Sequence, residues 1–186
     1  MKFSPEAICA ISTLVFAQPA FAQASCELGA PATNMPTEFS QFDFIIGDFD
    51  INYRQMTDDG WSEPLGTARW NGRYSLDGRA IMDWWYDDSG AGVNTRIYDP
   101  NEKIWKTAWH YTSNYEVREL RQRVWEDDGK LHLWQVYPEA DERNVYFETY
   151  EDGRWARIDQ RKDTKTGEWS PAVMLEAIPA SCAPRH

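Results

Sequence analysis

The chain has 186 residues, and 10 tryptophans, 9 tyrosines and 8 phenylalanines make 15% of its side chains aromatic. This content excludes a disordered protein, because large apolar groups offset the entropy lost on ordering, and the length suits one domain with a sizeable core. The formal net charge of −11 repels phosphate backbones, and we therefore expect no nucleic-acid partner.

Residues 1–22 have the pattern of a secretory signal peptide. A short charged start is followed by an apolar stretch from Ala7 to Ala17, and an A-x-A cleavage site ends at Ala22. Cleavage after Ala24 and a lipoprotein signal acylated at Cys26 are alternatives. Neither this stretch nor any later segment reaches the length of a membrane span. We therefore expect a periplasmic or secreted protein with no integral membrane segment after signal cleavage.

Two cysteines remain after cleavage, one near each end of the mature chain. In an oxidising compartment Cys26 and Cys182 are expected to form a disulfide, the alternative being two unpaired thiols. We expect residues 23–40 to be an N-terminal lead and residues 41–186 to form a single β-barrel domain.

The rest of the chain alternates runs of about 7 to 12 residues rich in Trp, Tyr, Val, Ile and Arg with short turn signals. No segment shows a long helical period. About ten strands joined by short turns predict an all-β fold, an antiparallel up-and-down β-barrel. The turn signals are Asp58 to Gly60, Asp77-Gly78, Ser89 to Gly92, Asp99 to Asn101, Ser113-Asn114, Asp128-Gly129, Pro138 to Asp141, Asp152-Gly153 and Thr164 to Gly167.

Two-residue hairpin loops allow the strand register to be counted backwards from each turn. Counting from Asp77-Gly78 places Trp70 opposite Trp85. Two turns counted independently agree on the position of Gln122. Counting from Ser113-Asn114 places it opposite Trp105, and counting from Asp128-Gly129 places it on the same face as Gln135. The same count around Asp152-Gly153 separates two faces of the last hairpin: Val145, Phe147, Thr149, Ala156 and Ile158 on one, and Tyr146, Glu148, Tyr150, Trp155, Arg157 and Asp159 on the other.

Each predicted sheet segment has a more aliphatic face and a face that mixes Arg with aromatic residues. We expect the aliphatic face to point inward, with outer Arg side chains covering Trp and Tyr by stacking and cation–π contacts. The outer tryptophans would then be Trp84, Trp125, Trp134 and Trp155, and Glu148 and Arg157 would form an outer ion pair. The reverse orientation would line a cavity with Arg and require a protein partner over the exposed aliphatic face.

The segment Phe42–Ile51, which includes Gly47-Asp48-Phe49, resembles the Gly-x-Trp entrance of the calycin superfamily, which includes lipocalins, fatty-acid-binding proteins and nitrobindins. Phe49 replaces the tryptophan that closes the barrel floor in that family. The segments Ser75–Arg79 and Ile97–Trp105 are similar to hairpins of secreted bacterial proteins placed in the superfamily. The resemblance covers residues 42 to about 179 and implies a barrel with a ligand cavity. Calycins bind lipids, pigments, haem and small acids, and a few are isomerases, cyclases or hydratases, so fold alone does not choose a function.

The nitrobindin resemblance makes the histidines relevant, because nitrobindins bind haem. His110 and His132 fall on the outward face in the counted register, and their cross-strand partners lie about 26 Å apart along one strand, too far to share a metal. His186 lies at the terminus. We expect no haem, no metal and no other cofactor.

The inward face combines polar and aromatic residues that suit a ligand cavity. Asp83 and Glu116 are candidate acids or bases, since burial raises a carboxyl pKa. A structural alternative is an internal pair of Asp83 with Arg118. The candidate ligand-binding residues are Tyr53, Trp70, Tyr74, Trp85, Trp105, Trp109, Tyr111, Arg118, Gln122 and Gln135.

Three functions follow from this face. The leading hypothesis is a small-molecule-binding protein of lipocalin type that holds an apolar or amphipathic ligand in the barrel. The alternative is a cofactor-independent lyase, isomerase or hydratase that uses an interior carboxylate. The third is a structural or interaction module with a filled core.

Overall fold

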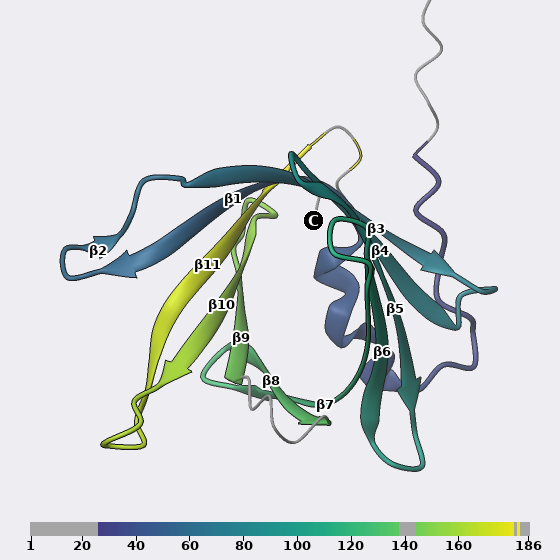
Figure 1. Cartoon of the computed structure of the whole chain (residues 1–186). Coiled ribbons are helices and arrows are strands. Elements are labelled where there is room, and N and C mark those ends of the chain that lie inside the picture. The colour runs from purple at the N-terminus through teal and green to yellow at the C-terminus, as the bar shows by residue number, and fades with distance from the viewer. Residues whose placement is uncertain (1–25, 138–143, 181, 183–186) are drawn as a thin grey trace, which may run out of the picture.

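The computed structural model describes residues 26–137, 144–180 and 182 and has eleven strands and one short 3-10 helix in these ranges (Figure 1). The strands follow one another around the sheet, and β1 pairs with both β3 and β11, so ten strands close an antiparallel up-and-down barrel. The predicted fold class is confirmed. The elements are η1 (Thr37–Ile45), β1 (Gly47–Thr57), β2 (Gly60–Trp61), β3 (Gly66–Ser75), β4 (Ala80–Asp87), β5 (Gly90–Asp99), β6 (Ile104–Tyr111), β7 (Glu116–Asp127), β8 (Lys130–Tyr137), β9 (Asn144–Thr149), β10 (Trp155–Lys162) and β11 (Trp169–Pro179).

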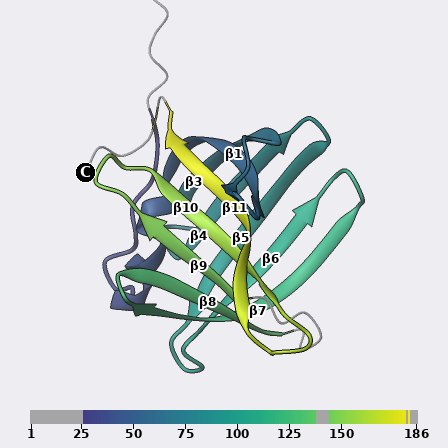
Figure 2. The same cartoon turned by 90° about the vertical axis from the view of Figure 1, so that its left-hand side faces the viewer.

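The register counted from three turns is confirmed. Trp70 lies opposite Trp85 on β3 and β4. On β7, Gln122 lies opposite Trp105 of β6 and also opposite Gln135 of β8. The strands cross the wall obliquely in chain order, as Figure 2 shows for β8 to β11.

The register predicted for the last hairpin is wrong by one residue. Thr149 pairs with Trp155, and Tyr150 N–H donates to the Arg154 carbonyl at 2.9 Å. These pairs close a three-residue loop, in which Gly153 alone has a positive φ, of 82°. A one-residue shift moves every side chain of the strand to the other face. In β10, Trp155, Arg157 and Asp159 therefore point inward, and the predictions of an outer Trp155 and of a Glu148–Arg157 ion pair are wrong.

The helix η1 closes one end of the barrel, which we call the plugged end. Its residues Phe39, Phe42 and Ile45 are buried. The ring centroid of Phe39 lies 5.5 Å from that of Trp105, and the centroid of Phe42 lies 4.9 Å from it. A Cβ at Gly72 would lie 1.9 Å from the carbonyl oxygen of Ile45, so only glycine lets the end of the helix approach β3 this closely.

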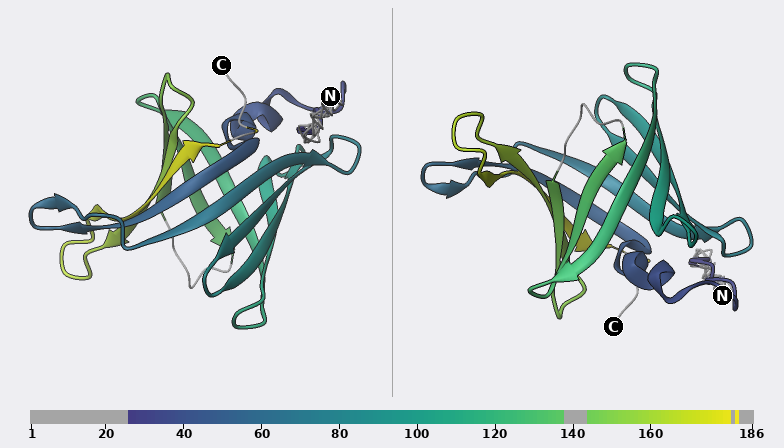
Figure 3. Two further views of the ribbon diagram at one scale, coloured as in Figure 1. Left: turned by 90° about the horizontal axis from the view of Figure 1, so that it is seen from above. Right: turned by 90° about the horizontal axis from the view of Figure 1, so that it is seen from below.

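The two ends of the described chain meet near η1 at the plugged end (Figure 3). A disulfide joins Cys26 and Cys182, whose Cα atoms are 5.5 Å apart, and confirms the predicted pairing. The N-terminal lead is also hydrogen-bonded to the barrel, because the Tyr74 N–H of β3 donates to the Leu28 carbonyl at 2.9 Å. The predicted signal peptide, residues 1–22, lies outside the described residues, and η1 begins four residues before the expected domain boundary at residue 41.

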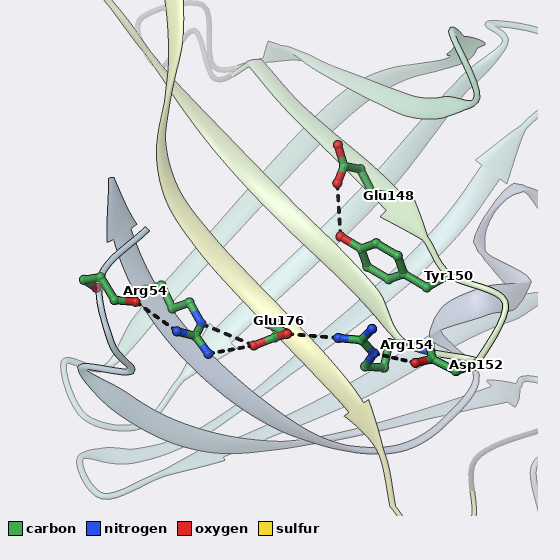
Figure 4. Close-up of polar contacts among 7 residues, drawn as sticks. Arg54, Glu148, Tyr150, Asp152, Arg154 and Glu176 are labelled. Atoms are coloured by element: carbon green, nitrogen blue, oxygen red, sulfur yellow. Dashed lines mark hydrogen bonds and ion pairs between the residues drawn. The ribbon is translucent and has the colours of Figure 1, made fainter. Parts of the chain in front are cut away.

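Charged side chains cover the outer face where the first and last strands meet. Glu176 of β11 accepts hydrogen bonds from Arg54 of β1 at 3.1 and 3.2 Å and from Arg154 at 3.3 Å (Figure 4). The guanidinium of Arg154 also lies 5.1 Å from the ring centroid of Tyr150. Under this layer the outward-facing Ala156 of β10 is fully buried. On this face an Arg side chain thus covers Tyr150, as expected for the outer tyrosines, whereas the outer Trp125 stacks on His132.

Candidate functional site

A cavity of about 420 Å³ lies inside the barrel. Much of its wall is aromatic or aliphatic, and its polar side chains come from several strands. Of the residues expected to face a ligand, those that line it are Tyr53, Trp70, Trp85, Trp109, Glu116, Arg118, Gln122 and Gln135. Val145 and Phe147 also line it, on the aliphatic face that was expected to point inward. The other lining residues were not among the expected ligand-binding residues: Asn94, Arg96, Thr107, Leu120, Leu133, Arg157, Asp159, Val173 and Leu175.

Two expected ligand-binding residues instead hold the plug. Trp105 is fully buried against η1, and its Nε1–H donates to Gln41 Oε1 at 3.1 Å. The Tyr74 hydroxyl donates to the Asp43 carboxylate. Burial, this hydrogen bond and the Asp43 charge raise the pKa of Tyr74, so it remains a donor at neutral pH. Trp105 and Tyr74 therefore fix η1 against the barrel and do not face the cavity.

Asp83, the first candidate acid or base, lies behind the cavity wall. Its side chain is 0% exposed, its Oδ1 lies 2.9 Å from Arg96 Nη2, and its Oδ2 accepts from Asn94 Nδ2 at 2.8 Å. The predicted pair with Arg118 is wrong, because Arg96 on the neighbouring strand occupies that role. Burial raises the pKa of Asp83, while Arg96 and Asn94 stabilise its ionised form and oppose the rise.

Arg96 joins the plugged end to the cavity. Its guanidinium carbon lies 5.6 Å from the ring centroid of Phe42 and 5.8 Å from that of Trp70, so cation–π contacts hold it against the plug. The residue is 8% exposed, and its Nε has no hydrogen-bond partner among the described atoms. The Oδ1 atom of Asp83 beside it also makes no hydrogen bond among the described atoms, so charge attraction at 2.9 Å holds this pair together.

Two further ion pairs face the cavity. Arg157 Nε lies 2.9 Å from Asp159 Oδ1 on β10. Both side chains point inward because the observed pairing of β9 with β10 differs by one residue from the predicted pairing. Arg118 pairs with Glu116, the second candidate acid or base, on β7. Each carboxylate on the wall therefore has a guanidinium beside it.

A hydrogen-bond cluster around Asp87 shapes the end of the barrel remote from η1. The Asp87 carboxylate accepts from Trp85 Nε1 at 2.6 Å, from the Tyr111 hydroxyl at 2.9 Å and from Ser89 N–H at 2.8 Å. Tyr111 stacks on Trp109 with 5.7 Å between ring centroids. The expected ligand residue Tyr111 thus does not line the cavity but positions Trp109, which does.

A glycine on β5 makes room for the same aromatic wall. A Cβ at Gly92 would lie 2.2 Å from Cη2 of Trp109, so the indole occupies the space that a side chain would fill. Because Gly92 lies opposite both Trp85 and Tyr111, the three aromatic residues gather around one backbone position.

Replacement of Asp87 by Asn is expected to change the acid sensitivity of the protein. Partial burial raises the pKa of Asp87, but hydrogen bonds from Trp85, Ser89 and Tyr111 outweigh it and lower the pKa from 3.8 to about 2. The stability that the ionised group contributes is present above pH 3.8 and is lost as the pH falls to about 2. Thermal unfolding from pH 2 to 6 should show Asp87→Asn less stable than the parent at pH 6, with the difference shrinking toward pH 2. Asp88→Asn, at the exposed neighbour, should show no such trend, and equal profiles for the two variants would contradict this role of Asp87.

The histidines lie away from the cavity where they are described. His110 borders a depression on the outer face of the sheet, and His132 stacks on Trp125 with 5.4 Å between ring centroids. His186 lies outside the described residues. Within residues 26–137, 144–180 and 182, no group of three or more His, Cys, Asp or Glu side chains is arranged to hold a metal ion.

No family model matches the chain, and no curated protein matches it. The single described helix, η1, is too short to cross a membrane. The barrel and the chemistry of its cavity therefore have to indicate the function.

Proposed function

We propose that the protein is a small-molecule-binding barrel of lipocalin type that belongs to the calycin superfamily and holds an amphipathic ligand in its cavity. The observation that supports this most directly is an interior space of about 420 Å³ bordered by Trp70, Trp85 and Trp109 and by paired guanidinium groups. Known ligand pockets span about 300 to 1,000 Å³ and combine apolar walls with a few placed polar groups. A filled-barrel module would not leave such a space.

The cavity geometry favours binding over catalysis. An enzyme using an interior carboxylate would need Glu116 or Asp159, because Asp83 lies behind Arg96. A guanidinium lies beside each of those two carboxylates. These ion pairs hold the carboxylates against the wall and engage their oxygens, so neither carboxylate is left free to exchange a proton with a ligand.

We also propose a periplasmic or secreted location. The Cys26–Cys182 bond supports an oxidising compartment. The signal-peptide pattern of residues 1–22 agrees with it.

The binding function is tested with a ligand of known properties and with the protein from its natural source. We expect native mass spectrometry of the mature protein to show a bound small molecule, and N-phenyl-1-naphthylamine, an uncharged fluorescent probe, to bind at one site per chain. Trp109→Ala should weaken probe binding at least about tenfold, because it removes part of the cavity wall. Trp125→Ala is the matched control, since Trp125 lies on the outer face and is 41% exposed.

Two results would contradict the binding function. One is a protein that carries no small molecule and binds no probe, which would support a filled barrel. The other is equal loss of binding in Trp109→Ala and Trp125→Ala, which would place the probe outside the cavity. Turnover of a bound compound that Glu116→Gln abolishes without loss of binding would support the enzymatic alternative.

A further inference from the structure

The charges around the cavity balance one another. Among the described residues, three guanidinium groups line the cavity, and each has a carboxylate within ion-pair distance. The Asp83 carboxylate lies directly behind Arg96, and the other two carboxylates share the wall with their partners. The pairs are Arg96–Asp83, Arg118–Glu116 and Arg157–Asp159.

This balance decides against a charged ligand. A buried ion costs several kcal/mol unless an opposite charge compensates it. An anionic ligand would find guanidinium groups whose charge is already compensated, and it would leave one net negative charge inside a protein whose formal charge is −11. A cationic ligand would face carboxylates that are equally compensated. The described wall thus has strong hydrogen-bonding groups but no net charge.

The remaining hydrogen-bonding capacity suits an uncharged oxygen. Arg96 borders the cavity beside Asn94 and Thr107, and its guanidinium has more N–H donors than its ion pair with Asp83 uses. A carbonyl, ether or hydroxyl oxygen accepts a hydrogen bond from such a donor without adding charge. The aromatic wall of Trp85 and Trp109 can hold an apolar body on the side remote from η1.

We infer that the ligand is an electrically neutral molecule with an apolar body and an acceptor oxygen that binds at Arg96, and not a carboxylic acid. This inference rests on the proposed binding function and specifies its ligand class. The cavity selects against anions although three guanidinium groups border it, because their partner carboxylates set its net charge to zero.

A matched pair of compounds tests the inference. 1-Naphthylacetamide and 1-naphthylacetate share an aromatic body and a carbonyl oxygen and differ in charge. We expect calorimetry at pH 7.5 to show that the amide binds at least about tenfold more tightly, since one uncompensated charge at about 10 Å in a medium of effective dielectric about 20 has an effect of this size. Equal or tighter binding of the acetate would overturn the inference.

Charge-removing variants test its cause. Asp83→Asn and Asp159→Asn each remove one negative charge and leave the cavity net positive, so the affinity ratio should shift toward the acetate by about tenfold. Asp159→Asn provides the test if Asp83→Asn does not fold. Asp152→Asn makes the same change on the outer face, where the carboxylate bonds to Arg154 at 2.7 Å, and should leave the ratio unchanged. An unchanged ratio in every folded cavity variant would overturn the inference.

The failures of the two proposals are distinguishable. If N-phenyl-1-naphthylamine binds in the cavity and the acetate is preferred to the amide, the binding function stands and the neutral ligand class is wrong. If neither that probe nor the two naphthyl compounds bind, both proposals are wrong.

Discussion

Replacement of Arg96 by Met should lower the free energy of unfolding by about 3 to 5 kcal/mol, because it leaves the Asp83 carboxylate buried without its cation. Asp83 is 0% exposed, and its remaining hydrogen-bond donor among the described side chains is Asn94. Urea unfolding at pH 7 measures the loss. The loss should shrink as the pH falls, because protonation removes the uncompensated charge.

Two variants show whether the loss comes from the buried charge. Arg96→Met combined with Asp83→Leu should recover much of the lost stability, since apolar groups can replace a buried pair at little cost. Arg154→Met should cost only about 1 kcal/mol, because its ion pairs lie on the outer face (Figure 4). A cost for Arg96→Met no larger than that for Arg154→Met would contradict the assignment.

Replacement of Cys26 and Cys182 by Ser should also destabilise the protein strongly, by about 2 to 5 kcal/mol. The bond closes a loop over a sequence separation of 156 residues, and loss of this constraint increases the entropy of the unfolded chain. Unfolding midpoints of the parent with and without a reducing agent, beside those of the double Ser variant, measure the effect. Reduction should bring the parent to the stability of the variant.

The disulfide prediction has a direct chemical check. The intact mass of the mature protein should rise by two hydrogens on reduction. No change in mass, or an unfolding midpoint that reduction does not alter, would contradict a stabilising bond between the two ends of the barrel.

The barrel could be predicted because its turns specify register locally. Asp128 and Gly129 both have positive φ, of 49° and 71°, as a two-residue type I′ loop requires. That turn therefore supported a correct count along β7 and β8. The turn at Asp152-Gly153 has the same residue pair, but Asp152 is not among the residues with positive φ. A dipeptide alone does not distinguish a two-residue loop from a three-residue loop.

The inner charged pair could not be predicted because β5 had no clear counting point. The signal from Ser89 to Gly92 contains several turn residues. In the structure, the Asp87 side chain selects the turn by accepting hydrogen bonds from the backbone N–H groups of Ser89 and Gly90 at 2.8 and 2.9 Å. Counting from that turn places Arg96 opposite Ile81 and Asn94 opposite Asp83. The partner of Asp83 thus depends on the hydrogen bonds of a side chain at the end of β4, and not on the sequence of β5.

The plug could not be predicted either. Residues Thr37–Ile45 form η1 with no side-chain cap at its start, and their apolar residues resembled the entrance to a strand. The helix is stabilised by the aromatic residues it covers, since Phe42 lies against Trp105 and Phe147. Tertiary packing of this kind leaves little periodic signal in a nine-residue segment.

The three-residue loop between β9 and β10 has a consequence for how this barrel can diversify. If Asp152 and Gly153 alone formed a two-residue loop, Glu151 would lie opposite Arg154, and this one-residue shift would turn Arg157 and Asp159 toward solvent and Ala156 and Ile158 toward the cavity. A change at this surface turn that favoured the two-residue loop could therefore exchange a salt-bridged wall for an aliphatic one without any substitution inside the barrel. In related chains, the residues that this turn brings opposite one another would predict the polarity of the cavity better than the identity of the strand residues.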